Sequence, residues 1–322
     1  MIIGSYSDQE GNIIGFRAVE TGAEIEILDG DTKIIDVTFD STRVGTPTSK
    51  TLTIANTGDR PLILTDLNLP DGFSLIEPLP NNFNLAPENT VELAVQLDAE
   101  TGGGFNGTLE LIACDSEENL FGFTSTIYGA VNGSGEDDTL VGSAVVDTLV
   151  GGGGNDRIFG KGGDDNLQGH PGNDHLFGGS GDDILIGGIG RDRLNGGEGN
   201  DTLTGGASID RFIFATNQEF ALEDIGVDTI TDFDLVRDLI LFDRETFTAI
   251  ESEASIDEVF ATVTTNAVAI ISEAAIVYNS NNGNLFYNAN GSDSGFGRGG
   301  QFAILSNQPE LSGENFFIRA LT

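Results

Sequence analysis

Nine aspartates recur every nine residues along the middle of the chain, and they are the residues whose type and spacing best suit chemistry. They occupy the sixth place of nine consecutive nine-residue units between residues 133 and 213: Asp138, Asp147, Asp156, Asp165, Asp174, Asp183, Asp192, Asp201 and Asp210. Carboxylates in strict phase, beside the carbonyls of glycine-rich turns, offer only oxygen ligands, which suits a hard and large divalent cation. The pattern therefore predicts a row of calcium sites.

Other divalent cations fit this ligand set less well. Magnesium requires a near-ideal octahedron and retains its water, while zinc prefers His and Cys, of which the repeats offer only His170 and His175, two side chains that we expect to face solvent. Besides the aspartates, the candidate ligands come from the first, third and fifth places of the six central turns: Gly151, Gly153, Asn155, Gly160, Gly162, Asp164, Gly169, Pro171, Asn173, Gly178, Ser180, Asp182, Gly187, Ile189, Gly196, Glu198 and Asn200.

The same units carry one apolar residue at the eighth place: Leu140, Leu149, Ile158, Leu167, Leu176, Leu185, Leu194, Leu203 and Phe212. Glycines at the first, second and fourth places permit positive φ, so six residues can reverse the chain before three extended residues follow. Two units make one coil, and coils stack about 4.8 Å apart as parallel strands. Five turns then stack on one side of the roll and four on the other, which leaves four gaps and three gaps between neighbouring turns. With one calcium ion in each gap, seven ions is the upper limit.

The best copies, residues 178–186 and 196–204, match a glycine-rich nonapeptide pattern, and here the chain resembles the RTX family of secreted proteins. The resemblance implies a calcium-binding parallel β-roll of nine nonapeptides over residues 131–214. The first, second and last units lack the fourth-place glycine, which is typical of capping repeats. The alternative is a flexible Gly/Asp-rich linker. A linker would not keep an aspartate at the sixth place and an apolar residue at the eighth place of all nine units. Without calcium, however, one apolar side chain per unit cannot offset an ordering cost of roughly 1 to 2 kcal/mol per residue, so we expect folding to require calcium.

The flanking segments also predict β-structure, so the fold class is all-β. Residues 23–130 alternate short strands with turns, which favours an antiparallel β-sandwich; residues 51–58, 84–89 and 107–111 are similar to immunoglobulin-like domains of the ASPM/SPD-2/hydin group. We interpret this domain as a spacer or an adhesive module, with the lone Cys114 in its core, and leave residues 1–22 unassigned. Residues 215–322 predict a β-rich cap with a hairpin at Asn282 and Gly283.

The cap resembles the region after the repeats in serralysin-type and cyanobacterial RTX proteins, in residues 228–233 and 283–287. That resemblance implies an uncleaved signal for a type I exporter near the end of the chain, where Glu314 and the apolar residues 316–318 are similar to the serralysin-type terminus. Asn315 intervenes and residues 319–322 extend the chain, so a plain amphipathic last strand remains the alternative.

Composition excludes several classes. A net charge of −38, from 14 basic and 52 acidic residues, would repel nucleic acid. No apolar run is long enough to span a membrane, and the first residues lack the pattern of a signal peptide. We therefore expect an extracellular or cell-surface protein, secreted without an N-terminal signal peptide.

No catalytic constellation is apparent. A zinc protease needs two histidines at helical spacing with a glutamate base, and neither this nor a nucleophile elbow occurs. The sequence predicts a non-catalytic, calcium-binding surface-structural or adhesive protein whose partners are calcium, the type I secretion machinery and a cell-surface glycan or another surface protein. The alternatives are a secreted enzyme or enzyme accessory subunit acting on extracellular polysaccharide or protein, and a simple calcium store or export carrier.

Overall fold

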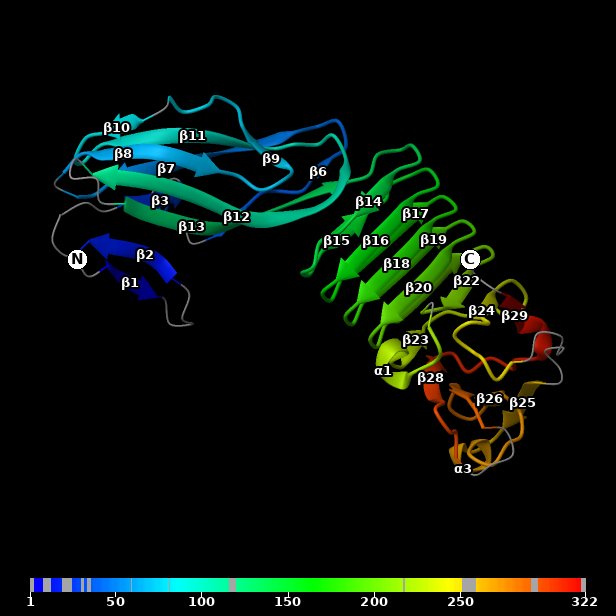
Figure 1. Ribbon diagram of the computed structural model, residues 1–322. Coiled ribbons are helices and arrows are strands. Elements are labelled where there is room, and N and C mark those ends of the chain that lie inside the picture. Colours follow the sequence, from blue (N-terminus) through cyan, green and yellow to red (C-terminus); the bar gives the residue numbers. More distant parts are fainter. Residues whose placement is uncertain are drawn as a thin grey trace. The chain divides into compact units, whose positions relative to one another are not determined.

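The computed structural model (Figure 1) is built almost wholly of β-strands. It describes residues 3–7, 13–18, 25–29, 32–33, 36–58, 60–80, 82–115, 120–216, 218–250, 259–290 and 295–319. The chain divides into two compact units, Met1–Val131 and Asn132–Thr322, which we describe separately. Within the described residues, no helix has the length and apolar content needed to cross a membrane.

The first unit contains two main sheets. One has the order β4-β3-β7-β11-β9: β3 (Ile25–Asp29), β4 (Thr32–Lys33), β7 (Thr48–Asn56), β9 (Phe73–Leu75) and β11 (Thr90–Leu97). The other contains β10 (Phe83–Leu85), β8 (Leu62–Asn68), β12 (Gly102–Asp115) and β13 (Leu120–Asn132), with β5 (Asp36–Thr38) and β6 (Thr42–Arg43) also paired to β13. Residues left unassigned from sequence include a separate antiparallel pair, β1 (Ile3–Ser7) and β2 (Ile13–Ala18).

Alternating side chains of both sheets meet in one core. Val95 and Leu97 of β11 are buried with Leu109 and Leu111 of β12. The half-buried Cys114 lies near the end of β12. The predicted antiparallel sandwich is confirmed except at β5, which pairs with β13 in parallel.

The second unit begins with the roll, whose nine strands match the nine units. They are β14 (Thr139–Val141), β15 (Thr148–Val150), β16 (Arg157–Gly162), β17 (Asn166–Pro171), β18 (His175–Ser180), β19 (Ile184–Ile189), β20 (Arg193–Glu198), β21 (Thr202–Ala207) and β22 (Arg211–Phe214). The strands alternate between two parallel sheets: the first roll sheet starts β14-β16-β18-β20-β22 and the second starts β15-β17-β19-β21. Figure 1 shows them as a regular stack.

The eighth-place residues form the core of the roll. The first seven each pair with the residue 18 positions later, as Leu176 does with Leu194 in the first roll sheet and Leu185 with Leu203 in the second. Leu203 and Phe212 pair with Ile230 and Ile240 of the cap. All nine are at most 1% exposed. Because each unit contributes one such side chain, each coil buries a single pair.

The stack continues beyond the repeats. β24 (Leu239–Asp243) and β29 (Phe316–Arg319) extend the first roll sheet in parallel, while β23 (Asp228–Ile230) and β28 (Gly300–Leu305) extend the second. The second sheet ends with β27 (Asn284–Tyr287), β26 (Ile276–Asn279) and β25 (Phe260–Val263); α1 (Leu222–Ile225), α3 (Asn266–Ala269) and the 3-10 turn η1 (Gly313–Asn315) complete the cap. Roll and cap therefore share one core across residues 214 and 215, where the sequence predicts a boundary.

The cap closes the roll with aromatic side chains. Phe242 stacks on Phe316 with centroids 5.6 Å apart and meets Phe302 edge-on at 5.8 Å. The predicted hairpin is confirmed: β26 and β27 are antiparallel around a turn in which Gly283 has a φ of 78°.

Truncation of the core tests this architecture. We expect Leu185→Ala to lower the free energy of unfolding in excess calcium by about 2 to 5 kcal/mol, because it leaves a cavity between coils that stack rigidly. Ile184→Ala, on the same strand but 44% exposed, is the control and should change stability by no more than about 0.5 kcal/mol. Equal losses in the two variants, measured by urea unfolding, would contradict a core of one residue per unit.

Candidate metal centre

The turns depend on glycine for two different reasons. From the third unit onward the second-place residue has a positive φ, as at Gly179 (φ 122°), and so does the fourth-place residue, as at Gly181 (φ 124°), except at Gly172. First-place glycines are not left-handed, so the expectation of positive φ there is wrong. The reason is space: a Cβ on Gly187 would lie 2.6 Å from both Asp192 Oδ2 and the carbonyl oxygen of Gly205. A side chain at the first place would thus fill the room where these oxygens meet.

From Asp156 onward, one oxygen of each sixth-place carboxylate joins neighbouring coils. Asp183 Oδ1 accepts the backbone N–H of Asp165 at 2.7 Å, and Asp201 Oδ1 accepts that of Asp183 at 2.8 Å. The same bond recurs from Asp156 onward through the last repeat. The aspartates therefore have a structural role in addition to any ligand role.

The other oxygen has no partner in seven of the nine aspartates. The Oδ2 atoms of Asp156, Asp165, Asp174, Asp183, Asp192, Asp201 and Asp210 are buried and accept no hydrogen bond from any described residue. In five turns this oxygen converges with the first-place carbonyl of the next turn: Asp156 with Gly169, Asp165 with Gly178, Asp174 with Gly187, Asp183 with Gly196 and Asp192 with Gly205. A buried carboxylate oxygen without a donor is costly unless a cation neutralises it.

The first two aspartates differ from these seven. Asp138 Oδ2 accepts the N–H and the hydroxyl of Ser134 at 2.6 and 2.8 Å, and Asp147 Oδ2 accepts the same two groups of Ser143 at 2.6 and 2.8 Å. Serine at the second place thus satisfies the carboxylate locally. This pattern agrees with capping units at the start of the roll.

Burial raises the pKa of the seven carboxyl groups. It raises the pKa of Asp165, Asp183 and Asp192 to about 7, and of Asp174, Asp201 and Asp210 to about 6, and that of Asp156 also rises. The hydrogen bond from the preceding coil opposes this shift, while neighbouring aspartates add to it. At neutral pH, therefore, the stacked turns hold protons more tightly than free aspartates do.

The fifth-place candidates hold coils together with their side chains. Asn155 Oδ1 accepts the N–H of Asn173 at 3.0 Å, and Asp182 Oδ1 accepts that of Asn200 at 2.8 Å and that residue's amide at 3.2 Å. Asp164 Oδ1 likewise accepts the N–H of Asp182. All of these side chains are exposed, so they lie outside the turn interior.

The third-place candidates contribute backbone rather than side chains. The carbonyls of Ser180, Ile189 and Glu198 accept fourth-place N–H groups of the preceding turn at 2.8 to 2.9 Å. Their side chains and that of Pro171 are exposed, and Gly153 and Gly162 are half-buried. The first-place residues Gly151, Gly160, Gly169, Gly178, Gly187 and Gly196 are all buried.

Three aspartates after the repeats continue the pattern. Asp228 Oδ1 accepts the N–H of Asp201 at 3.1 Å and Asp238 Oδ1 that of Asp210 at 2.9 Å. Asp232 accepts the N–H groups of Gly205 and Gly206. Sequence reasoning missed them as site residues because they follow at 27 or 28 residues instead of 18. The available signal was that Asp228 begins one short strand and Asp238 directly precedes the next.

The ligand chemistry suits calcium. Within the described part of the chain, no three His, Cys, Asp or Glu side chains gather as a metal site, so each turn offers one carboxylate with main-chain oxygens. His170 is exposed, as expected, and its Nε2 lies 3.3 Å from Oε1 of Gln168. His175 is half-buried on the outer face of the first roll sheet, so the expectation that it faces solvent holds in part. Neither histidine shares the turn interior with the unpartnered carboxylate oxygens.

Some solved structures are weakly similar. The AlgE6R3 subunit of the Azotobacter vinelandii mannuronan C5-epimerase matches at 23% identity and a TM-score of 0.22, covering 57% of this chain and 80% of that one. The ASH/PapD-like domain of human CEP192 matches at 12% identity and a TM-score of 0.30 over 42% of this chain and 98% of that one. The Vibrio cholerae protease VesB matches at 16% identity and a TM-score of 0.26, and the match covers 38% of this chain and only 43% of VesB. Likenesses this weak carry no argument about function.

No curated protein matches this sequence. The model of the RTX calcium-binding nonapeptide repeat, in contrast, matches residues 132–167, 159–194 and 177–212, the stretch that holds the unpartnered carboxylates. The chain thus carries RTX calcium-binding nonapeptide repeats within residues 132–212, and this match supports the resemblance of that stretch to the RTX family.

Proposed function

We propose that the protein is a secreted, non-catalytic, surface-structural or adhesive protein whose roll folds on binding calcium after type I export. The observation that carries this proposal is the set of seven buried aspartate Oδ2 atoms without a donor. A divalent cation would neutralise these carboxylates and join successive turns through their oxygens. Folding and ion binding are then one event.

The five turns in which a carboxylate and the next turn's carbonyl converge are the most complete sites. Asp201 and Asp210 supply two further unpartnered oxygens at the last repeats, beside the cap. We therefore expect five ions between the stacked repeats and up to two more where Asp201 and Asp210 meet the turns of Asp228 and Asp238. Asp138 and Asp147 act as turn caps in this proposal rather than as ligands, because Ser134 and Ser143 occupy their second oxygen.

Calcium would act as a switch during export. In the cytosol, where calcium is scarce, repelling carboxylates keep the repeats loose enough to thread a channel. Outside, sites with dissociation constants of about 10⁻⁴ to 10⁻³ M fill and the coils stack. In the proposed order of events, residues 314–318 serve as the export signal while the chain is open; Phe316 is then buried against Phe242 as β29 forms.

The sandwich of the first unit would serve as an immunoglobulin-like spacer, with a cell-surface glycan or another surface protein as the partner of the folded molecule. Its two-sheet core needs no ion to account for its burial. In this division of labour the roll responds to calcium and the sandwich does not.

Chelation is the first test. Circular dichroism and calorimetry of the full chain should show a cooperative unfolding transition that appears with calcium and is lost in chelator, while the transition of the first unit persists. Filling each site to about one hundred times its dissociation constant contributes roughly 2.7 kcal/mol, so several sites should move the midpoint by many degrees. An identical transition with and without calcium would end the proposal.

Substitution of one ligand is the second test. We expect Asp183→Asn to reduce bound calcium by about one ion and to raise the calcium midpoint of folding roughly tenfold, since ligand charge sets calcium affinity. Asn retains the Oδ1 atom that accepts the Asp165 N–H. Asp182→Asn, one residue earlier and exposed, removes the same charge and is the control. Equal effects of the two substitutions in calcium titrations would mean that net charge, not a ligand, matters.

Acidity provides the third test. Because the folded pKa values lie above the ordinary value of 3.8, protonation favours the stacked turns. In chelator, the contribution of these groups is full below pH 4 and is lost as the pH rises through 6 to 7. In chelator, the ordered fraction of the roll, measured by circular dichroism, should therefore rise as the pH falls from 7.5 to 5. A triple variant, Asp165→Asn with Asp183→Asn and Asp192→Asn, should show a flatter dependence; an unchanged slope would contradict the assignment.

A further inference from the structure

The outer face of the second roll sheet presents ten uncharged side chains in register. The seventh and ninth places of its units lie on β15, β17, β19 and β21, where outward residues alternate with buried ones, and β23 continues both rows. Parallel pairing places each member beside its counterpart on the next strand. We call this set the uncharged face: Thr148, Val150, Asn166, Gln168, Ile184, Ile186, Thr202, Thr204, Thr229 and Thr231.

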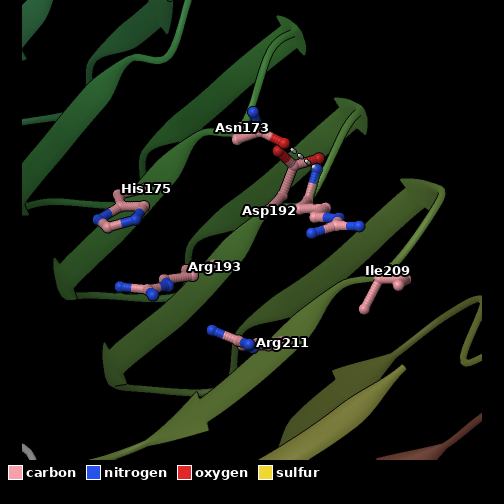
Figure 2. A pocket seen from close by; sticks show the side chains of 7 residues that line it. Asn173, His175, Asp192, Arg193, Ile209 and Arg211 are labelled. Carbon is pink, nitrogen blue, oxygen red and sulfur yellow. Dashed lines mark hydrogen bonds between the residues drawn. The ribbon is translucent and has the colours of Figure 1, made fainter. Parts of the chain in front are cut away.

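The fold does not require a face without charge. Charged residues make up 20% of the chain, and the seventh place of the first roll sheet holds ionisable side chains: Arg157, His175, Arg193 and Arg211. Figure 2 shows three of them, His175, Arg193 and Arg211, beside one hollow. The two outer faces of the roll therefore differ in surface chemistry, although the same repeat builds both.

Isoleucine occupies the middle of the uncharged face. β19 is the central one of its five strands, and on β19 Ile184 is 44% exposed, Ile186 is half-buried and Ile189, at the end of the strand, is 63% exposed. The strands on either side present mainly amides and hydroxyls. The exposed carboxylates of Asp164 and Asp182 lie in the turns before β17 and β19. An apolar centre inside a polar and charged rim is the composition of a protein–protein interface.

We propose that the uncharged face binds the same face of a second copy of this chain. Two copies, each with a net charge of −38, repel one another over most of their surfaces, so close approach costs least where both surfaces are uncharged. Amide and hydroxyl groups both donate and accept hydrogen bonds, so one set of such side chains complements itself across a two-fold axis. A charged partner would instead bury its charge against a face that has none to pair with it.

A two-fold axis through the middle of the face brings β19 of one copy against β19 of the other. The contact then removes the exposed surface of Ile184 and Ile186 from water, which supplies the driving force. At one side of the face, the hydroxyls of Thr204 and Thr231 already bond to each other at 2.8 Å. These two side chains are therefore ordered before the copies meet and lose less freedom on binding.

The area of the face sets the expected strength of the contact. Five strands of up to six residues, spaced about 4.8 Å apart with a rise of about 3.3 Å per residue, cover roughly 400 Å² on each copy. A standard interface takes about 800 Å² from each partner, so we expect a reversible dimer with a dissociation constant between about 1 µM and 1 mM. Copies displayed together on a surface would sum such weak contacts. The inference names a second copy as the surface-protein partner of the proposed function and rests on a roll that calcium has folded.

Sedimentation equilibrium of the calcium-loaded full chain, at concentrations from about 1 µM to 1 mM, tests this contact. We expect a monomer–dimer equilibrium that Ile184→Asp weakens by about tenfold or more, because like charges would then meet across the axis. Ile76→Asp is the matched control, since Ile76 is 51% exposed in the first unit and its substitution adds the same charge away from the face. A chain that stays monomeric throughout this range, or equal effects of the two substitutions, would overturn the inference and leave the face to a different protein or a glycan.

Complementary charge provides a second measurement. We expect a mixture of Ile184→Asp with Ile184→Lys to associate more tightly than Ile184→Asp alone, since opposite charges then meet across the axis. A mixture that associates no more tightly would refute the pairing of this face with itself. Circular dichroism and calcium binding of each variant separate loss of the contact from loss of the fold. A chain that folds and dimerises equally in chelator would refute the calcium proposal and leave this contact standing.

Discussion

The roll depends on burying a carboxylate in every turn. The two oxygens of that group have opposite consequences: Oδ1 accepts a backbone N–H from the coil before it, as Asp183 does from Asp165, while Oδ2 is buried without a donor. The first contact fixes the spacing of the coils, and the second stacks like charges along the same line. A cation between turns would resolve the conflict, and first-place glycine and main-chain carbonyls leave room for one beside the unpartnered oxygen.

The ends of the stack solve the same problem without that arrangement. At the first two turns, Ser134 and Ser143 donate two hydrogen bonds each to the second carboxylate oxygen. At the far end, Asp238 Oδ2 accepts the N–H of Asp234, and aromatic side chains such as Phe242 and Phe302 close the core. A solenoid whose units contact only their neighbours needs such closed ends. The roll is thus bounded by turns that are satisfied by the protein itself.

Periodicity made much of this fold predictable and also set the limit of prediction. Eighth-place residues such as Leu185 are buried, and parallel pairing at 18 residues is confirmed, because a strict repeat specifies both at once. The continuation through Asp228 and Asp238 was not predicted as part of the site, since an insertion breaks the period there. Spacing also could not tell the buried aspartates of the sixth place from the exposed side chains of the fifth place, which bond from coil to coil. The two places are adjacent and both hold acidic residues in several units, so they look equivalent in sequence.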